Sequence, residues 1–121
     1  MSLPTPEKIR EFIVRSIELW NDQDRAEFFK VYKEMAPGGF RFEMPVGRGI
    51  QEGWGALEKM WDDYGPHVRI EIRQLIVNGH EAAAVMANLP RQGAQAHDVP
   101  SIETYHFRED GSFHARYFAD M

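Results

Sequence analysis

The sequence predicts an α+β domain in which helices come first and a run of antiparallel strands follows. Two observations predict it: apolar residues recur every three to four positions in the first half of the chain and alternate with period two in the second half. Asn78-Gly79 and Asp110-Gly111 separate alternating segments, as tight hairpin turns do. This pattern is typical of helices that cover one face of a curled sheet. At 121 residues, the chain is expected to form one domain over residues 1–121.

Composition excludes several function classes. The chain is 43% hydrophobic and 27% charged, which is typical of a globular protein, and it has no cysteine for disulfides or thiolate chemistry. Its net charge of -5, without a cluster of Lys and Arg, argues against a nucleic-acid partner. No apolar run is long enough for a membrane span and no secretory signal is apparent, so we expect a soluble, cytoplasmic protein.

The first helix is predicted to begin after Thr5, because Thr5, Pro6 and Glu7 combine an N-cap, a first-turn proline and an early acid. Ser16 falls on the apolar face of this helix, so a hydroxyl interrupts a surface that is otherwise expected to be buried. The apolar residues at helical spacing are Ile9, Phe12, Ile13, Ile17 and Trp20.

Two further helices and the strands follow in order. Asp24 with Glu27 resembles a capping box at the start of a second helix, and the segment 36–39 ends it. A third, short helix includes residues 56–61 and ends at Gly65-Pro66. Asn78-Gly79 predicts a type I′ hairpin, and residues 90–95 are expected to form a loop. Strands are predicted over residues 40–44, 68–77, 81–89, 99–107 and 113–118.

This order of elements resembles the NTF2-like superfamily, and particular segments are similar to bacterial ketosteroid isomerase. The likeness runs over nearly the whole chain. It implies a cone-shaped fold, with three N-terminal helices packed on a curled, mainly antiparallel sheet around a deep apolar pocket. Its strongest pieces are Leu3-Pro4-Thr5, the Ser16-Ile17-Glu18-Leu19 segment, Asp24, Tyr32 and the segments 43–47, 53–61 and 107–111.

In ketosteroid isomerases, an aspartate on the first strand moves a proton between two steroid carbons, while a tyrosine and a protonated aspartic acid bind the oxyanion. Carried over by position, the proton-moving aspartate is replaced by Met44, before Pro45, and the oxyanion tyrosine by Ser16. The carboxylic-acid position falls on Glu103, which keeps the carboxyl group. Tyr32 matches a supporting tyrosine. The resemblance therefore implies Glu103, Ser16 and Tyr32 as catalytic candidates.

Glu103 is the central candidate, because a buried carboxyl has a raised pKa and can act as acid, base or hydrogen-bond donor. Alternation places Ser101 and Tyr105 on the same strand face as Glu103. The same residue pattern would also fit a solvent-facing glutamate or a filled core. The residues expected to line the pocket are Trp20, Met44, Met60, Trp61, Val85, Ala87, Leu89, Val99, Ser101, Tyr105, Arg116 and Phe118.

Arg116 and Glu43 are two further charged candidates for the site. Arg116 is assigned to the same strand face as Phe118, where it can pair with Glu103. A purely structural salt bridge between neighbouring strands accounts for an arginine at this position equally well. Glu43 is a substitute base only if a bulge turns it toward the pocket, because alternation puts it opposite Met44. The five histidines have no metal-ligand spacing and the glycines form no phosphate-binding loop, so we expect neither a metal nor a cofactor.

The sequence leaves two functions open. The first is a cofactor-independent acid/base enzyme, of isomerase, dehydratase or cyclase type, acting on an apolar, steroid-like or polycyclic carbonyl compound. The second is a non-catalytic domain for hydrophobic-ligand binding or dimerisation, since fold alone does not separate the two. A small apolar molecule is the expected partner in either case. The resemblance also implies a homodimer formed through the outer face of the sheet.

Overall fold

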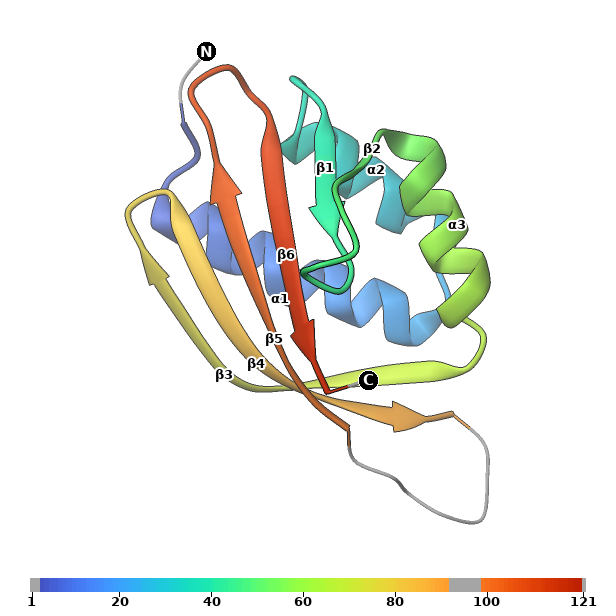
Figure 1. Cartoon of the computed structure of the whole chain (residues 1–121). Helices are drawn as coiled ribbons and strands as arrows, with labels where there is room; N and C mark the ends of the chain where they lie inside the picture. Colours follow the sequence, from blue (N-terminus) through green and yellow to red (C-terminus); the bar gives the residue numbers. More distant parts are fainter. Residues whose placement is uncertain (1–2, 92–98, 121) are drawn as a thin grey trace.

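The computed structural model describes residues 3–91 and 99–120 and contains three helices packed on one six-stranded sheet. Figure 1 shows the helices on one side of the curled sheet. The part of the loop predicted at residues 92–95 lies outside the described residues. The elements are α1 (Pro6–Asp22), α2 (Arg25–Met35), β1 (Phe40–Glu43), β2 (Gln51–Glu52), α3 (Trp54–Tyr64), β3 (Val68–Asn78), β4 (Glu81–Pro90), β5 (Val99–Phe107) and β6 (Phe113–Ala119).

The first two helices begin where their capping residues predict. The hydroxyl of Thr5 accepts a hydrogen bond from the backbone N–H of Lys8 at 3.2 Å, and the carboxylate of Asp24 accepts one from Glu27 N–H at 3.3 Å. Each contact satisfies an N–H group that has no partner within its own helix. In the part of the chain that the structure describes, no helix combines the length and apolar character needed to cross a bilayer.

The sheet has the strand order β2-β1-β6-β5-β4-β3. Strands β3, β4, β5 and β6 form consecutive antiparallel pairs, while β1 runs parallel to β6. The two-residue β2 pairs with β1 and was not expected from the sequence, because two exposed residues carry no alternating pattern. The predicted α+β fold is confirmed, with a sheet that is mainly antiparallel.

Two local features of β3 differ from the prediction. The register between β3 and β4 shifts between Ile72 and Gln74, so a bulge interrupts the expected simple alternation. The turn after β3 has Gly79 and His80 at its centre, since Asn78 pairs with Glu81. Only Gly79 has a positive φ, of 58°, whereas a type I′ turn needs positive φ at both central residues. The type I′ prediction is therefore wrong.

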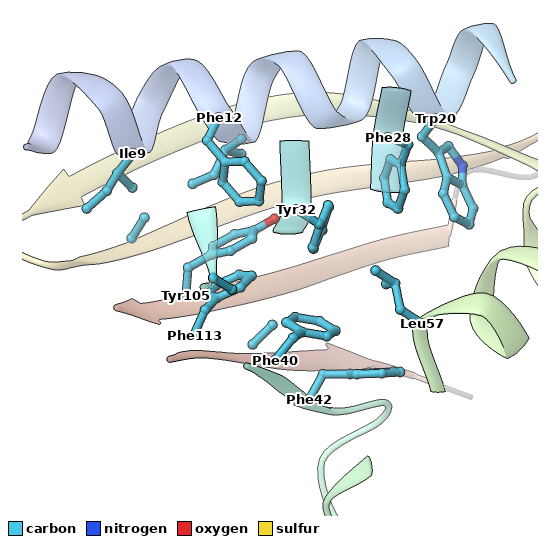
Figure 2. Packing of buried hydrophobic residues seen from close by; sticks show 14 of the residues in the cluster. Ile9, Phe12, Trp20, Phe28, Tyr32, Phe40, Phe42, Leu57, Tyr105 and Phe113 are labelled. Atoms are coloured by element: carbon cyan, nitrogen blue, oxygen red, sulfur yellow. The ribbon is translucent and has the colours of Figure 1, made fainter. Parts of the chain in front are cut away.

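The core lies between α1 and the concave face of the sheet and consists largely of aromatic rings. Figure 2 shows Phe12 of α1 above Tyr105 and Phe113 of the sheet. Phe113 is fully buried and stacks on Tyr105 at a centroid distance of 5.7 Å. Trp20 and Trp61 meet edge to face at 5.0 Å and join α1 to α3. Phe12, Tyr105 and Phe113 form the part of this core nearer the start of α1.

Candidate functional site

At the other end of the cone, the three helices and the sheet enclose a cavity of about 520 Å3. Its volume is in the range of small-molecule sites. In Figure 2, Trp20 and Phe28 lie on the helix side and face Leu57 and Phe42, and all four line the cavity. Most of the wall is aromatic or aliphatic, so the cavity offers an apolar ligand an environment from which water is largely removed.

Glu103 brings a carboxyl group to this apolar wall. It lies on β5 and lines the cavity, as the alternation of that strand predicts. Burial raises the pKa of the Glu103 carboxyl to about 7, and a hydrogen bond with Tyr105 partly opposes the rise. Removal from water disfavours the charged form, which is the physical cause of the shift. Near neutral pH the group is therefore present both as acid and as carboxylate.

Two phenols flank Glu103. Tyr105 is buried and hydrogen-bonds with the carboxyl. Tyr32 of α2 lines the cavity, and the charge of Glu103 acts on its phenol. Burial raises the pKa of both phenols, and the neighbouring Glu103 charge adds to the rise. Both hydroxyls therefore remain protonated at neutral pH, and that of Tyr105 donates to the Glu103 carboxyl.

Ser16 supports Tyr32 from behind and does not line the cavity. Its side chain is 1% exposed, and its hydroxyl donates to the backbone oxygen of Ile13 at 2.9 Å. A hydrogen bond with Ser16 lowers the pKa of Tyr32, against the larger effect of burial. The Ser16 hydroxyl thus has its hydrogen-bond partner within α1 and can orient the Tyr32 phenol, but Ser16 does not reach the cavity.

The carboxylate nearest to the first strand's end is already paired. Glu43 borders the cavity, and its Oε2 accepts hydrogen bonds from Arg116 Nε at 2.7 Å and His114 Nε2 at 3.1 Å. The Arg116 hydrogen bond is the main reason why the pKa of Glu43 is lowered. Met44, the next residue, lines the cavity and precedes a cis peptide bond to Pro45. Glu43 is therefore a poor substitute base.

The expected pocket residues divide into two groups. The first group lines the cavity and consists of Trp20, Tyr32, Met44, Met60, Leu89, Val99 and Glu103. The second group does not line it. Within the second group, Trp61 is in the aromatic core, whereas Ser16, Ser101 and Tyr105 are buried behind the cavity wall.

The other four residues that were expected to line the pocket do not, because the sheet register turns their side chains away from it. Phe113 and Ala115 of β6 are buried, so alternation turns Arg116 and Phe118 to the outer face, where Arg116 pairs with Glu43 instead of Glu103. The same alternation on β4 faces Met86 inward and turns Val85 and Ala87 away from the cavity. The sequence prediction had placed all four on the wrong side of the sheet.

Tyr117 and Asn88 line the cavity and were missed by sequence reasoning. The ladder places Tyr117 directly opposite Glu103, since β5 and β6 pair through Phe107 and Phe113. Counting back from the Asp110-Gly111 turn would have found this pairing. Asn88 continues the inward face of β4, where it follows small and apolar residues, so only its position at the end of that pattern marks it.

Within residues 3–91 and 99–120, no group of three or more His, Cys, Asp or Glu side chains is placed to hold a metal ion. His97 lies outside the described residues. The polar side chains that line the cavity are the carboxyls of Glu43 and Glu103, three phenols, the Asn88 amide and the His67 imidazole. This set can move protons and bind oxygen atoms of a ligand.

No family model and no curated protein matches the sequence. Solved structures do match. SalBIII, an epoxide hydrolase/cyclase-like enzyme with a role in pyran ring formation in the polyether salinomycin, superposes with a TM-score of 0.76 at 20% identity, covering 95% of this chain and 92% of that one. A protein from Jannaschia sp. CCS1 described as a SnoaL-like polyketide cyclase gives 0.77 at 19% identity, over 99% and 90%. Bal32a, from a soil-derived mobile gene cassette, gives 0.72 at 17%, over 93% and 89%.

These identities are low, and the similarity therefore concerns the fold. The superposition extends over nearly the whole of each compared chain. The resemblance seen in the sequence is confirmed at this level: the chain has the NTF2-like fold of the SnoaL-like and epoxide cyclase-like proteins.

Proposed function

We propose that the protein is a cofactor-independent acid/base enzyme, of isomerase, dehydratase or cyclase type, acting on an apolar carbonyl compound. The observation that carries the proposal is Glu103, a carboxyl with a pKa of about 7 on the wall of an apolar cavity and beside two phenols. A general base or acid works best when its pKa is close to the working pH. The structural neighbours that are described as cyclases add support from the fold.

The proposed chemistry is a proton transfer next to a carbonyl group. The ionised Glu103 accepts a proton from the carbon beside the carbonyl, and the electron pair of that C–H bond moves onto the carbonyl oxygen as an enolate. Where a C=C bond adjoins that carbon, the enolate is conjugated, and the carboxylic acid returns the proton to the far carbon of the dienolate; the double bond shifts into conjugation, and the carbonyl and the base are restored. A protonated phenol such as that of Tyr32 can donate a hydrogen bond to the enolate oxygen.

A 3-oxo-Δ5 steroid tests this proposal, because its isomerisation produces a conjugated enone with strong ultraviolet absorbance. We expect turnover by the wild-type protein and its loss in the Glu103→Gln variant. Glu43→Gln is the matched control, since Glu43 is already bound by Arg116 and His114 and should not be required. Turnover that survives Glu103→Gln would contradict the assigned role, and absence of turnover in the wild type would exclude this steroid class.

A second candidate function is ligand binding without chemistry. It is favoured by Met44, an apolar side chain that stands on the cavity wall where the resembling isomerases carry their proton-moving carboxylate. In that case Glu103 only binds a ligand oxygen. The two functions differ in one measurable respect: a binding domain holds an apolar carbonyl compound and leaves it unchanged, whereas the enzyme exchanges the hydrogens next to the carbonyl with solvent deuterium.

We also propose a homodimer formed through the outer face of the sheet. Apolar side chains on this face are unusually exposed: Ile76 at 49%, Ile102 at 44%, Phe118 at 39% and Val85 at 37%. A cluster of exposed apolar residues on a sheet face is typical of an interaction surface. A second copy would cover these side chains with the same apolar surface, as an isologous interface requires.

A further inference from the structure

A cluster of three polar side chains lies beside Glu103 in the same cavity and is not required for the proposed proton transfer. It contains Tyr117 of β6, Asn88 of β4 and Ser101 of β5. Tyr117 and Asn88 line the cavity, while Ser101 is 3% exposed and lies beneath them. The phenol of Tyr117 hydrogen-bonds with both other members. Three strands therefore bring their polar groups to one place on an otherwise apolar wall.

The hydrogen bonds of Asn88 determine which of its atoms can face a ligand. Its Nδ2 donates to the backbone oxygen of Val99 at 2.9 Å and to Ser101 Oγ at 2.7 Å. A backbone oxygen can only accept, so the amide nitrogen must point to Val99. Both amide hydrogens are thus in use. The hydrogen bond between Asn88 and Tyr117 therefore runs from the phenol hydroxyl to Oδ1, which keeps one free lone pair.

We propose that Tyr117 and Asn88 bind a hydroxyl group of the ligand at a second polar site of the cavity. A ligand hydroxyl fits this pair because it replaces the direct Tyr117–Asn88 hydrogen bond with two: it accepts one from the Tyr117 phenol and donates one to Asn88 Oδ1. Ser101 holds both partners in place through its own hydrogen bonds. A carbonyl group could use only Tyr117, and an ether likewise, so the site distinguishes a hydroxyl from either.

The ladder sets the spacing between the two polar sites. Tyr117 pairs with Glu103 at a spacing of about 5 Å, and Asn88 pairs with Val99, which is four residues or about 13 Å from Glu103 along β5. The inference rests on the proposed function, in which Glu103 faces the reacting carbonyl. The substrate class that follows is an apolar, ring-sized molecule with a carbonyl at one point and a hydroxyl roughly 5 to 13 Å away. The wall around both sites is apolar, with Met86, Ala115 and Phe42 among its residues.

Two fluorescent probes test the second site without requiring turnover. 2-Naphthol has one hydroxyl, and 2,6-dihydroxynaphthalene has the same rings with a second hydroxyl at the opposite end. We expect the wild-type protein to bind the diol roughly five to ten times more tightly, since one hydrogen bond contributes about 1 kcal/mol. In Tyr117→Phe, which retains the ring and loses only the hydroxyl, the preference should fall to near unity.

Tyr64→Phe is the matched control, because Tyr64 also lines the cavity but is not part of the Asn88–Ser101 hydrogen bonds. It should keep the preference for the diol. Equal binding of the two probes by the wild type, or a preference that survives Tyr117→Phe, would overturn the second site while leaving the Glu103 proposal intact. If neither probe binds, both the second site and the proposed apolar-ligand function are contradicted. Thermal unfolding of each variant confirms that it folds.

Discussion

Replacing Glu103 with glutamine should change how the stability of the protein depends on pH. The structure raises the pKa of this carboxyl from its ordinary value of 4.5 to about 7, mainly by burial. Glutamine has nearly the same size and cannot ionise. The difference in unfolding free energy between wild type and variant therefore isolates the ionisation of one group, provided both proteins unfold in a single step.

The sign follows from proton binding. Below pH 4.5 the carboxyl is protonated in both folded and unfolded protein, so its ionisation costs nothing. Between pH 4.5 and about 7 the unfolded chain loses the proton while the folded protein retains it, and the wild type loses stability as pH rises. Each pKa unit corresponds to about 1.4 kcal/mol, so the loss reaches about 3 kcal/mol above pH 7. Water entering the cavity would reduce this value.

Urea denaturation of both proteins at several pH values between 4 and 8 measures the effect. We expect the stability of the wild type relative to Glu103→Gln to fall by about 3 kcal/mol across this range. Glu43→Gln should show little change between pH 5 and 8, because Arg116 lowers the pKa of Glu43 from 4.5 and its stabilisation is lost, with the opposite sign, only as pH falls below that value. A difference for Glu103→Gln that stays constant with pH would mean that the pKa of Glu103 is the same in the folded and unfolded protein.

Three further predictions follow from particular contacts. Arg91→Ala should lower the unfolding free energy by about 2 kcal/mol in urea denaturation, because its guanidinium donates to three carbonyl oxygens at the ends of α1 and α3; an unchanged midpoint would contradict this. Tyr105→Phe should raise the pKa of Glu103 further in an NMR titration, since the Tyr105 hydrogen bond lowers it, and an unchanged or lower value would be evidence against that bond. Ile102→Glu should convert the proposed dimer to a monomer in analytical ultracentrifugation, whereas a monomeric wild type would rule out the outer-face dimer.

Much of the fold could be predicted because its signals are local. Thr5 and Asp24 mark the first two helix starts through contacts with residues three positions away. The alternation of β5 correctly put Glu103 and Tyr105 on one face, because period two is a property of the strand alone. The bulge in β3 was not visible, since one residue inserted between Ile72 and Gln74 depends on the partner strand.

The candidate site was predicted less completely because its walls depend on register between strands. A displacement by one residue on β6 exchanges Tyr117 for Phe118, which moves a phenol into the cavity and an apolar ring onto the outer face. The predicted face of Arg116 was wrong for the same reason: its side chain pairs with Glu43 across the β1–β6 pair. That parallel pair joins segments about seventy residues apart, and no short-range pattern specifies it.

The most direct test of the account is a titration of the Glu103 carboxyl carbon by 13C NMR, with the signal assigned by its absence in Glu103→Gln. The account predicts an apparent pKa of about 7, because the carboxyl faces an apolar cavity and is largely removed from water. Such a value would mean that the group exchanges a proton near neutral pH, as the proposed chemistry requires. A pKa near 4.5, the ordinary value, would show an ordinarily solvated glutamate and would contradict the central claim.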